Sequence, residues 1–134
     1  MRPLLAVSAA ALGALVVLGA LALAVGGDGP ADRRTVAAPI DDMRVATQRS
    51  LPAQYLVSIR AGLPSGCAQR HSHTVERKGD LVVITILNSM PTGDVACTMI
   101  YGWYDLEVAI GSDFVRGATY TVRVNDRTVT FTAG

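Results

Sequence analysis

The sequence is poor in the residues from which most catalytic and metal sites are built. Its 134 residues include two histidines, two cysteines, one tryptophan, four tyrosines and two phenylalanines. It contains no glycine-rich phosphate loop, no zinc-type ligand spacing and no hydrolase nucleophile elbow. These absences predict a protein without catalytic residues and without a cofactor, so we do not expect an enzyme.

A clustered basic surface is also missing. The chain carries 12 basic and 11 acidic residues, for a formal net charge of +1, and the basic residues are spread along its length. Proteins that bind nucleic acids concentrate lysine and arginine on one face, where these charges neutralise phosphates. The charge pattern therefore argues against a nucleic acid as a partner.

The longest hydrophobic run lies at the N-terminus, between Leu4 and Val25. A helix of about 22 residues is roughly 33 Å long, which is enough to cross the hydrocarbon core of a bilayer. We therefore expect residues 1–26 to form a hydrophobic helix that anchors the protein in the cell membrane with a single pass. The alternative is a signal peptide, because Ala22-Leu23-Ala24 offers small residues at a cleavage spacing, and cleavage there would give a secreted protein.

Beyond this run, the chain divides into a linker and one domain. Residues 27–37 contain glycine, proline and charged residues, which is typical of a flexible linker. From residue 38 to residue 134, apolar and polar side chains alternate with the period of two that β-strands have. Leu81–Asn88 is apolar on both faces, which predicts a central strand covered on two sides.

The domain is predicted to be all-β. About seven strands with short turns between them favour a single antiparallel β-sandwich. The expected strands cover residues 43–47, 55–61, 71–77, 81–88, 97–110, 119–124 and 128–132, with a hairpin turn at Asn125-Asp126. The fifth stretch is too long for one flat strand, and its apolar phase changes near Gly102, which predicts a β-bulge there.

Three motifs in this domain resemble those of small extracytoplasmic bacterial domains. They are Gly62-Leu-Pro-Ser-Gly-Cys67, Ala96-Cys-Thr-Met-Ile-Tyr-Gly102 and the ending Gly117-x-Thr-Tyr-Thr-Val-x-Val-Asn-Asp126. The ending is also similar to the penultimate hairpin of immunoglobulin-like modules. The resemblance covers about residues 38–134. It implies an immunoglobulin-like sandwich and an extracytoplasmic location, and it implies no functional residue.

Cys67 and Cys97 are expected to form a structural disulfide. They enclose about 31 residues, and closing a loop of that length stabilises a domain by roughly 3–4 kcal/mol in the entropic account. A disulfide in a strand-rich domain indicates an oxidising compartment, so we expect the domain to lie outside the membrane. The alternative is a Cys67 nucleophile with His71 or His73 as its base, but this arrangement lacks a group to orient the base.

His71 and His73 are the candidate metal ligands. On a strand, residues i and i+2 point to the same face about 6.5–7 Å apart, so both imidazoles could bind one metal ion. Met90 and Met99 could add thioether ligands suited to Cu(I). Two ligands make an incomplete site, however, and we favour two solvent-facing histidines, with Met99 in the core.

Tyr101, Trp103 and Tyr104 form an aromatic cluster in the sequence. If a bulge turned their rings outward, they would make a ligand surface for a glycan or a protein. We favour the other interpretation, in which the rings fill the core of the sandwich. Asp105 and Glu107 share one face of the same strand, and without an enclosing pocket such a pair is typical of a solvated surface rather than of acid–base catalysis.

The leading hypothesis is an extracytoplasmic binding or interaction module without catalytic activity, either tethered to the membrane or secreted. Its expected partner is an unknown envelope protein or glycan. The alternative is a small envelope protein that handles copper through His71 and His73. A sandwich fold does not dictate what its surface binds, so the fold does not decide between the two hypotheses. They differ in the residues that they need exposed.

Overall fold

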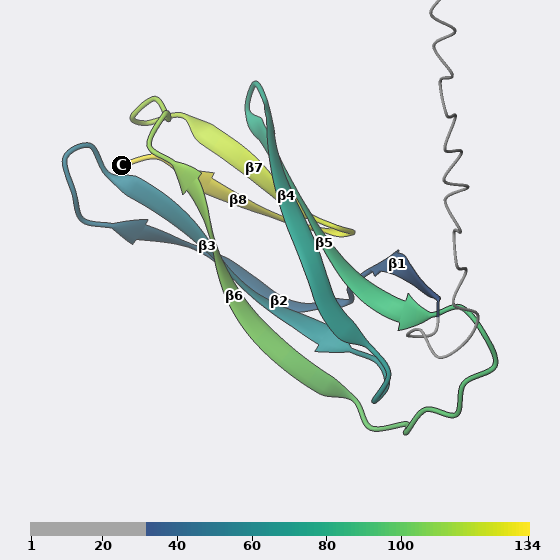
Figure 1. Cartoon of the computed structure of the whole chain (residues 1–134). Coiled ribbons are helices and arrows are strands. Elements are labelled where there is room, and N and C mark those ends of the chain that lie inside the picture. Colours follow the sequence, from purple (N-terminus) through teal and green to yellow (C-terminus); the bar gives the residue numbers. More distant parts are fainter. Residues whose placement is uncertain (1–31) are drawn as a thin grey trace, which may run out of the picture. The chain divides into compact units, whose positions relative to one another are not determined.

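The computed structural model describes residues 32–134, which form eight β-strands in two sheets, a β-sandwich (Figure 1). The strands are β1 (Arg33–Ala37), β2 (Ile40–Gln48), β3 (Gln54–Leu63), β4 (Gln69–Lys78), β5 (Leu81–Pro91), β6 (Gly102–Gly111), β7 (Thr119–Val124) and β8 (Arg127–Thr132). The predicted all-β class and sandwich architecture are confirmed. The expected N-terminal helix, residues 1–26, lies outside the described residues. Within residues 32–134, no helix is long and apolar enough to cross a membrane.

Strand β5 organises the larger sheet. β4 pairs with it in antiparallel orientation along one side. On the other side, β7 runs parallel to Leu81–Ile84, and β1 runs antiparallel to Leu87–Pro91. β8 lies beside β7, and the smaller sheet is antiparallel in the order β2-β3-β6. The parallel pairing of β5 with β7 departs from the purely antiparallel sandwich that the sequence predicts.

The core is formed by one face of each sheet. In β5, Val82, Ile84 and Ile86 are at most 1% exposed, and they share one apolar cluster with Val57 and Ile59 of β3. The same cluster contains Ala38, Ile40, Ala61, Val108, Val122 and Val124. The alternate side chains of β5 are only partly buried, so of the two covered faces expected from the sequence one is fully covered and the other in part. In a two-layer sandwich, only the inner face of a central strand meets another sheet.

Strand β1 falls in the segment expected to be a linker. Its pairing runs from Arg33 opposite Pro91 to Ala37 opposite Leu87. Four of its five side chains are exposed, so the strand shows no alternation of apolar and polar residues. Backbone pairing of this kind is not visible in the hydrophobic pattern, and the sheet therefore starts at residue 33.

The predicted bulge near Gly102 is wrong. β6 begins at Gly102, and the shift of register in its pairing with β3 lies next to Tyr55 instead. Residues 97–101 form no strand. They lie against the β3–β4 connection, where the N–H of Gly66 donates to the carbonyl of Thr98 (2.9 Å).

A buried polar contact joins the two sheets. Asn88 of β5 is fully buried, and its Nδ2 donates to the carbonyl of Gly62 in β3 (2.8 Å). Its Oδ1 accepts a hydrogen bond from the hydroxyl of Tyr104 in β6 (2.7 Å). A buried polar group without a partner costs about 1–3 kcal/mol, so these bonds fix the position of β5 relative to β3 and β6.

The hairpin turn predicted at Asn125-Asp126 is confirmed, and its asparagine has a second role. Asn125 has a φ of 52°, a left-handed conformation that asparagine tolerates well. Its Oδ1 accepts from the N–H of Ile86 (2.9 Å), and its Nδ2 donates to the carbonyl of Ala38 (2.7 Å). The turn therefore ties the β7–β8 hairpin to β5 and to the start of the smaller sheet.

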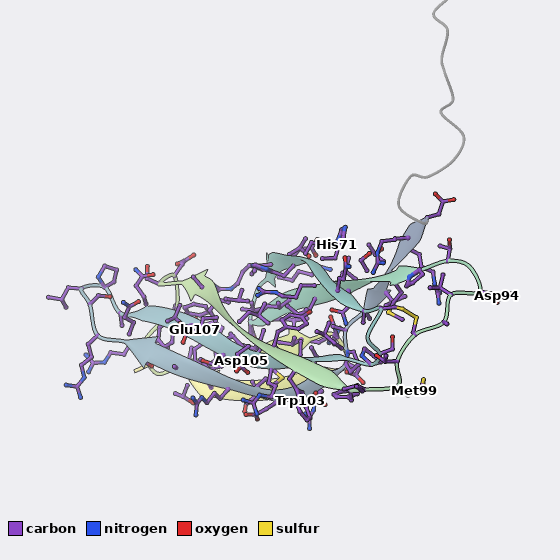
Figure 2. The ribbon with its side chains drawn as sticks, turned by 60° about the horizontal axis from the view of Figure 1, so that its bottom comes forward. His71, Asp94, Met99, Trp103, Asp105 and Glu107 are labelled. Carbon is purple, nitrogen blue, oxygen red and sulfur yellow. A yellow bond between two sulfur atoms is a disulfide. The ribbon has the colours of Figure 1, made fainter. Side chains whose placement is uncertain are left out.

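The structure contains the predicted disulfide between Cys67 and Cys97, whose Cα atoms are 5.5 Å apart. It joins the β3–β4 connection to the β5–β6 connection at one end of the sandwich (Figure 2). Because a sulfur atom in a disulfide is not a nucleophile, the hypothesis of a Cys67 nucleophile with a histidine base is wrong in this state of the protein.

We expect the double substitution Cys67→Ser/Cys97→Ser to lower the melting temperature strongly. The loss of about 3–4 kcal/mol corresponds to a decrease of more than about 10 °C for a domain of this size. Thermal unfolding followed by circular dichroism measures the change. Reduced wild-type protein is the matched control and should melt with the double variant. If it melted with the oxidised protein instead, the bridge would have no stabilising role.

Candidate functional site

An exposed apolar surface lies at the end of the sandwich that carries the disulfide (Figure 2). We call it the apolar tip, and we define it as the exposed apolar residues of the β5–β6 connection and the start of β6, namely Val95, Met99, Ile100, Tyr101 and Trp103. Met99 is 88% exposed, Ile100 72% and Trp103 60%. Single exposed apolar residues are common on proteins, whereas a group of them is typical of an interaction site.

Close packing against two glycines fixes this tip. A Cβ on Gly66 would collide with the hydroxyl of Thr98, and a Cβ on Gly62 would collide with the hydroxyl of Tyr101. Together with the disulfide, these contacts hold residues 97–101 against the β3–β4 connection. The first two motifs that carry the resemblance to extracytoplasmic domains thus pack directly against each other.

Tyr101 and Trp103 lie on the surface, so the favoured expectation that they fill the core is wrong. Their rings meet edge to face with centroids 5.5 Å apart. The hydroxyl of Tyr101 donates to Oδ2 of Asp41 (2.9 Å). Burial and this hydrogen bond to a carboxylate raise the pKa of Tyr101, which keeps the phenol protonated. The pair presents a fixed aromatic edge at the end of the smaller sheet.

Tyr104 points the other way, into the sandwich, where its ring packs against the core. Its hydroxyl binds Asn88, and the guanidinium of Arg70 lies 4.9 Å from the centre of its ring. Burial raises the pKa of Tyr104, and the positive charge of Arg70 opposes this shift. Of the three aromatic residues predicted as a ligand surface, the structure brings Tyr101 and Trp103 together and separates Tyr104 from them.

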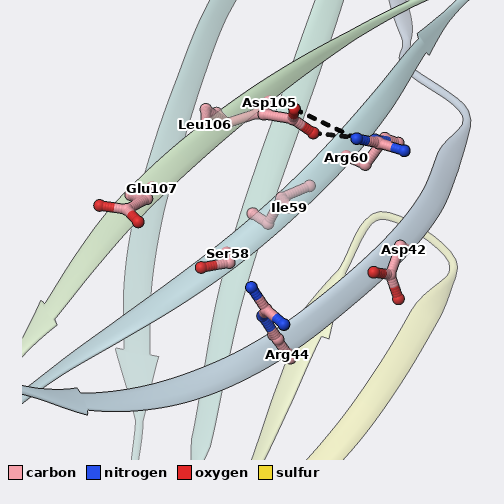
Figure 3. Close-up of a pocket in the computed structure, with 8 residues that line it drawn as sticks. All are labelled: Asp42, Arg44, Ser58, Ile59, Arg60, Asp105, Leu106 and Glu107. Carbon is pink, nitrogen blue, oxygen red and sulfur yellow. Dashed lines mark hydrogen bonds and ion pairs between the residues drawn. The ribbon is translucent and has the colours of Figure 1, made fainter.

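The outward face of the smaller sheet continues from the tip into a shallow polar hollow of about 340 Å³ (Figure 3). Its charged and polar lining residues are Asp42, Arg44, Ser58, Arg60, Asp105 and Glu107. Arg60 and Asp105 are cross-strand neighbours whose Nε and Oδ1 atoms are 2.9 Å apart. The hydrogen bond from Arg60 lowers the pKa of Asp105. This hollow offers paired charges in contact with water and does not enclose a substrate.

The two histidines lie on β4, in the other sheet. A shift of register between Arg70 and Ser72 interrupts the regular alternation at His71, whose Nδ1 is 2.8 Å from Oγ of Ser72. Both His71 and His73 are exposed, and within residues 32–134 no three His, Cys, Asp or Glu side chains are grouped as metal ligands. Arg70 lines the same small hollow as the histidines, and its positive charge opposes a metal cation there.

Met99 was expected in the core and is instead the most exposed residue of the tip. Sequence reasoning missed Met99 and Ile100 as surface residues, although a signal was present. Met99-Ile100-Tyr101 are three consecutive apolar residues, and on a strand they cannot all face one core. The turn sequence Thr92-Gly93-Asp94 and then Cys97 precede these three residues, and Gly102 follows them, which marks the segment as a tethered connection.

The fold and this surface define a small disulfide-linked β-sandwich domain with an exposed apolar end. Residues 57–133 match the family described as the ORF11 beta-sandwich domain, and the chain belongs to this family. The match runs from β3 to the residue after β8 and includes the disulfide and residues 95–103 of the tip. Neither the curated proteins nor the solved structures contain a significant match to the chain.

We expect titration with copper or zinc to give only weak binding that a mild chelator removes. His71 and His73 supply two imidazoles, whereas a tight closed site needs three or four ligands. Isothermal titration calorimetry of the wild type and of His71→Ala/His73→Ala measures the difference. Tight binding that survives the chelator and disappears in the double variant would contradict this expectation.

We expect Gly62→Ala to displace the ring of Tyr101 and to destabilise the protein by about 1–2 kcal/mol, because the new methyl group overlaps the phenol. In a Tyr101→Ala background, the same change should cost much less, since the colliding atom is gone. Urea unfolding of the wild type, the two single variants and the double variant measures their free energies of unfolding and completes this double-mutant cycle.

Gly93→Ala is the control for this cycle, because a Cβ there would meet no atom within 4 Å outside its two chain neighbours, and Gly93 is not adjacent to Tyr101 in the chain. It should cost the same with and without Tyr101. An equal cost of Gly62→Ala in both backgrounds would show that Tyr101 does not rest on Gly62.

Proposed function

We propose that the protein is an extracytoplasmic interaction module without catalytic activity, and that it presents the apolar tip to a component of the cell envelope. The observation that carries this proposal is the exposure of Met99, Ile100 and Trp103 on a segment held in place by a disulfide. A backbone that is already fixed loses little further conformational entropy on binding, so exposed apolar groups on it are well prepared for a partner.

The composition of the tip favours an apolar partner surface. Val95 and Ile100 are aliphatic, Met99 carries a thioether, and Tyr101 and Trp103 are aromatic. The partner expected from the sequence is an envelope protein or glycan. Trp103 and Tyr101 suit either class, whereas Met99 and Ile100 have no polar atoms for sugar hydroxyls and favour an apolar surface.

The proposed location is the outer face of the cell membrane, with Leu4–Val25 as a single-pass anchor. Secretion after cleavage at Ala22-Leu23-Ala24 is the alternative. The disulfide between Cys67 and Cys97 supports an oxidising compartment for the domain in both cases.

We also propose that the sandwich is a variant of the immunoglobulin-like fold. The chain passes between the two sheets at the β1–β2, β3–β4, β5–β6 and β6–β7 connections, as it does in Greek-key sandwiches. The short β1 strand and the parallel pairing of β7 with β5 are the features in which this variant differs from a purely antiparallel arrangement.

Fractionation of cells that express the full chain tests the location. We expect the protein in the membrane pellet, with a mass that includes Met1 to Val25, and we expect protease added to intact spheroplasts to digest the domain. A soluble form that starts at Val25 would favour secretion. A domain protected from protease, with reduced cysteines, would overturn the extracytoplasmic location.

The same cells test the tip. A benzophenone amino acid in place of Ile100 should form crosslinked products with an envelope component, and one in place of Thr128, an exposed residue of β8, should not. Equal crosslinking from the two positions would remove the support for a specific surface at the tip.

A further inference from the structure

The chain enters the domain at the end of β5, where the connection that carries the apolar tip begins. The N–H and the hydroxyl of Thr92 each donate to the carbonyl of Asp32, both at 3.0 Å. Arg33, the next residue, lies opposite Pro91 in the sheet, and its Nη2 donates to the carbonyl of Cys67 (2.7 Å). The first described residue is therefore fixed to the start of the β5–β6 connection, on which the tip is built (Figure 1).

The length of chain before Asp32 limits how far this residue can lie from the anchor. Residues 26–32, seven residues, separate Val25 from Arg33. A fully extended chain of that length spans at most about 25 Å. If Leu4–Val25 crosses a bilayer, as the proposed function holds, then Asp32 stays within about 25 Å of its surface.

The side chains at this end have the chemistry of a membrane interface. Tryptophan and tyrosine are enriched at the boundary between headgroups and acyl chains, because one part of the ring system is apolar and another forms hydrogen bonds. Met99 and Ile100, 88% and 72% exposed, supply aliphatic surface beside them. Asp32 and Asp94 offset Arg33 and Arg34 at this end, so apolar contact rather than charge would drive the association.

We propose that the apolar tip is a membrane-contact surface, in which Met99, Ile100 and Trp103 insert into the interfacial layer of the bilayer that carries the chain. This inference rests on the proposed membrane tether. The tether keeps the tip at a high local concentration near the lipid, so a small apolar surface is sufficient. The disulfide and the glycine contacts keep the three side chains projecting outward, so little ordering is needed on insertion.

Trp103 is the only tryptophan of the chain and therefore reports on this contact directly. The probe is the full chain reconstituted into phosphatidylcholine vesicles, with and without acyl chains brominated near the headgroup. A residue at the interface lies about 5–10 Å deep, so we expect Trp103 to lose roughly half or more of its fluorescence in the brominated vesicles.

The matched control moves the tryptophan to the opposite end of the sandwich. Leu51 is fully exposed in the β2–β3 connection, and the ten residues of β3 place it about 30 Å from the Gly102 end. In Trp103→Phe/Leu51→Trp, we expect little quenching. In Met99→Ser/Ile100→Ser, we expect Trp103 to be quenched several-fold less, with the melting temperature nearly unchanged because both side chains are exposed.

The outcomes separate this inference from the proposed function. If the chain floats with the vesicles and Trp103 is not quenched, the tether stands and membrane contact by the tip is overturned. Equal quenching at positions 103 and 51 also overturns it, because the contact would not be specific to the tip. If the chain does not float with the vesicles, the tether itself fails, and the inference fails with it.

Discussion

The exposed surface of this domain depends on the contact between Tyr101 and a glycine. Gly62 lies opposite Trp103 in the β3–β6 pairing, and any side chain there would occupy the place of the Tyr101 hydroxyl. The carbonyl of Gly62 is held from the core by Asn88, which in turn is held by the hydroxyl of Tyr104. One backbone position therefore connects the outer aromatic edge to the interior of the sandwich.

Exposure of this kind has to be enforced. Burying a side chain such as that of Met99 or Ile100 is worth about 1.5–3 kcal/mol, so a flexible connection would fold back onto the nearest apolar surface. Here the Cys67–Cys97 bridge and the bond between Gly66 and Thr98 hold the backbone away from the core. The disulfide and this hydrogen bond thus keep apolar groups exposed to water, and such an arrangement is typical of binding surfaces.

The sequence predicts those parts of the fold that leave a hydrophobic pattern, and it misses a strand that is held by backbone pairing alone. β5 is visible because Leu81–Asn88 is a run of apolar, mostly β-branched residues of the right length, whereas β1 makes backbone pairs with exposed side chains and leaves no such pattern. The error at the tip has a different origin. Counting back in steps of two from the buried Val108 places Tyr104 inward and Trp103 outward, as observed, and only the assumed bulge at Gly102 obscured this.

Asp105, a charged residue of the hollow on the smaller sheet, lacks the environment of a general acid. A general acid needs a carboxyl group whose pKa is raised by burial or by a neighbouring carboxylate. Asp105 is exposed, and its hydrogen bond with Arg60 lowers its pKa, so it stays ionised at neutral pH. The hollow on this face therefore offers ionised side chains next to an apolar edge, an arrangement that suits the proposed interaction surface.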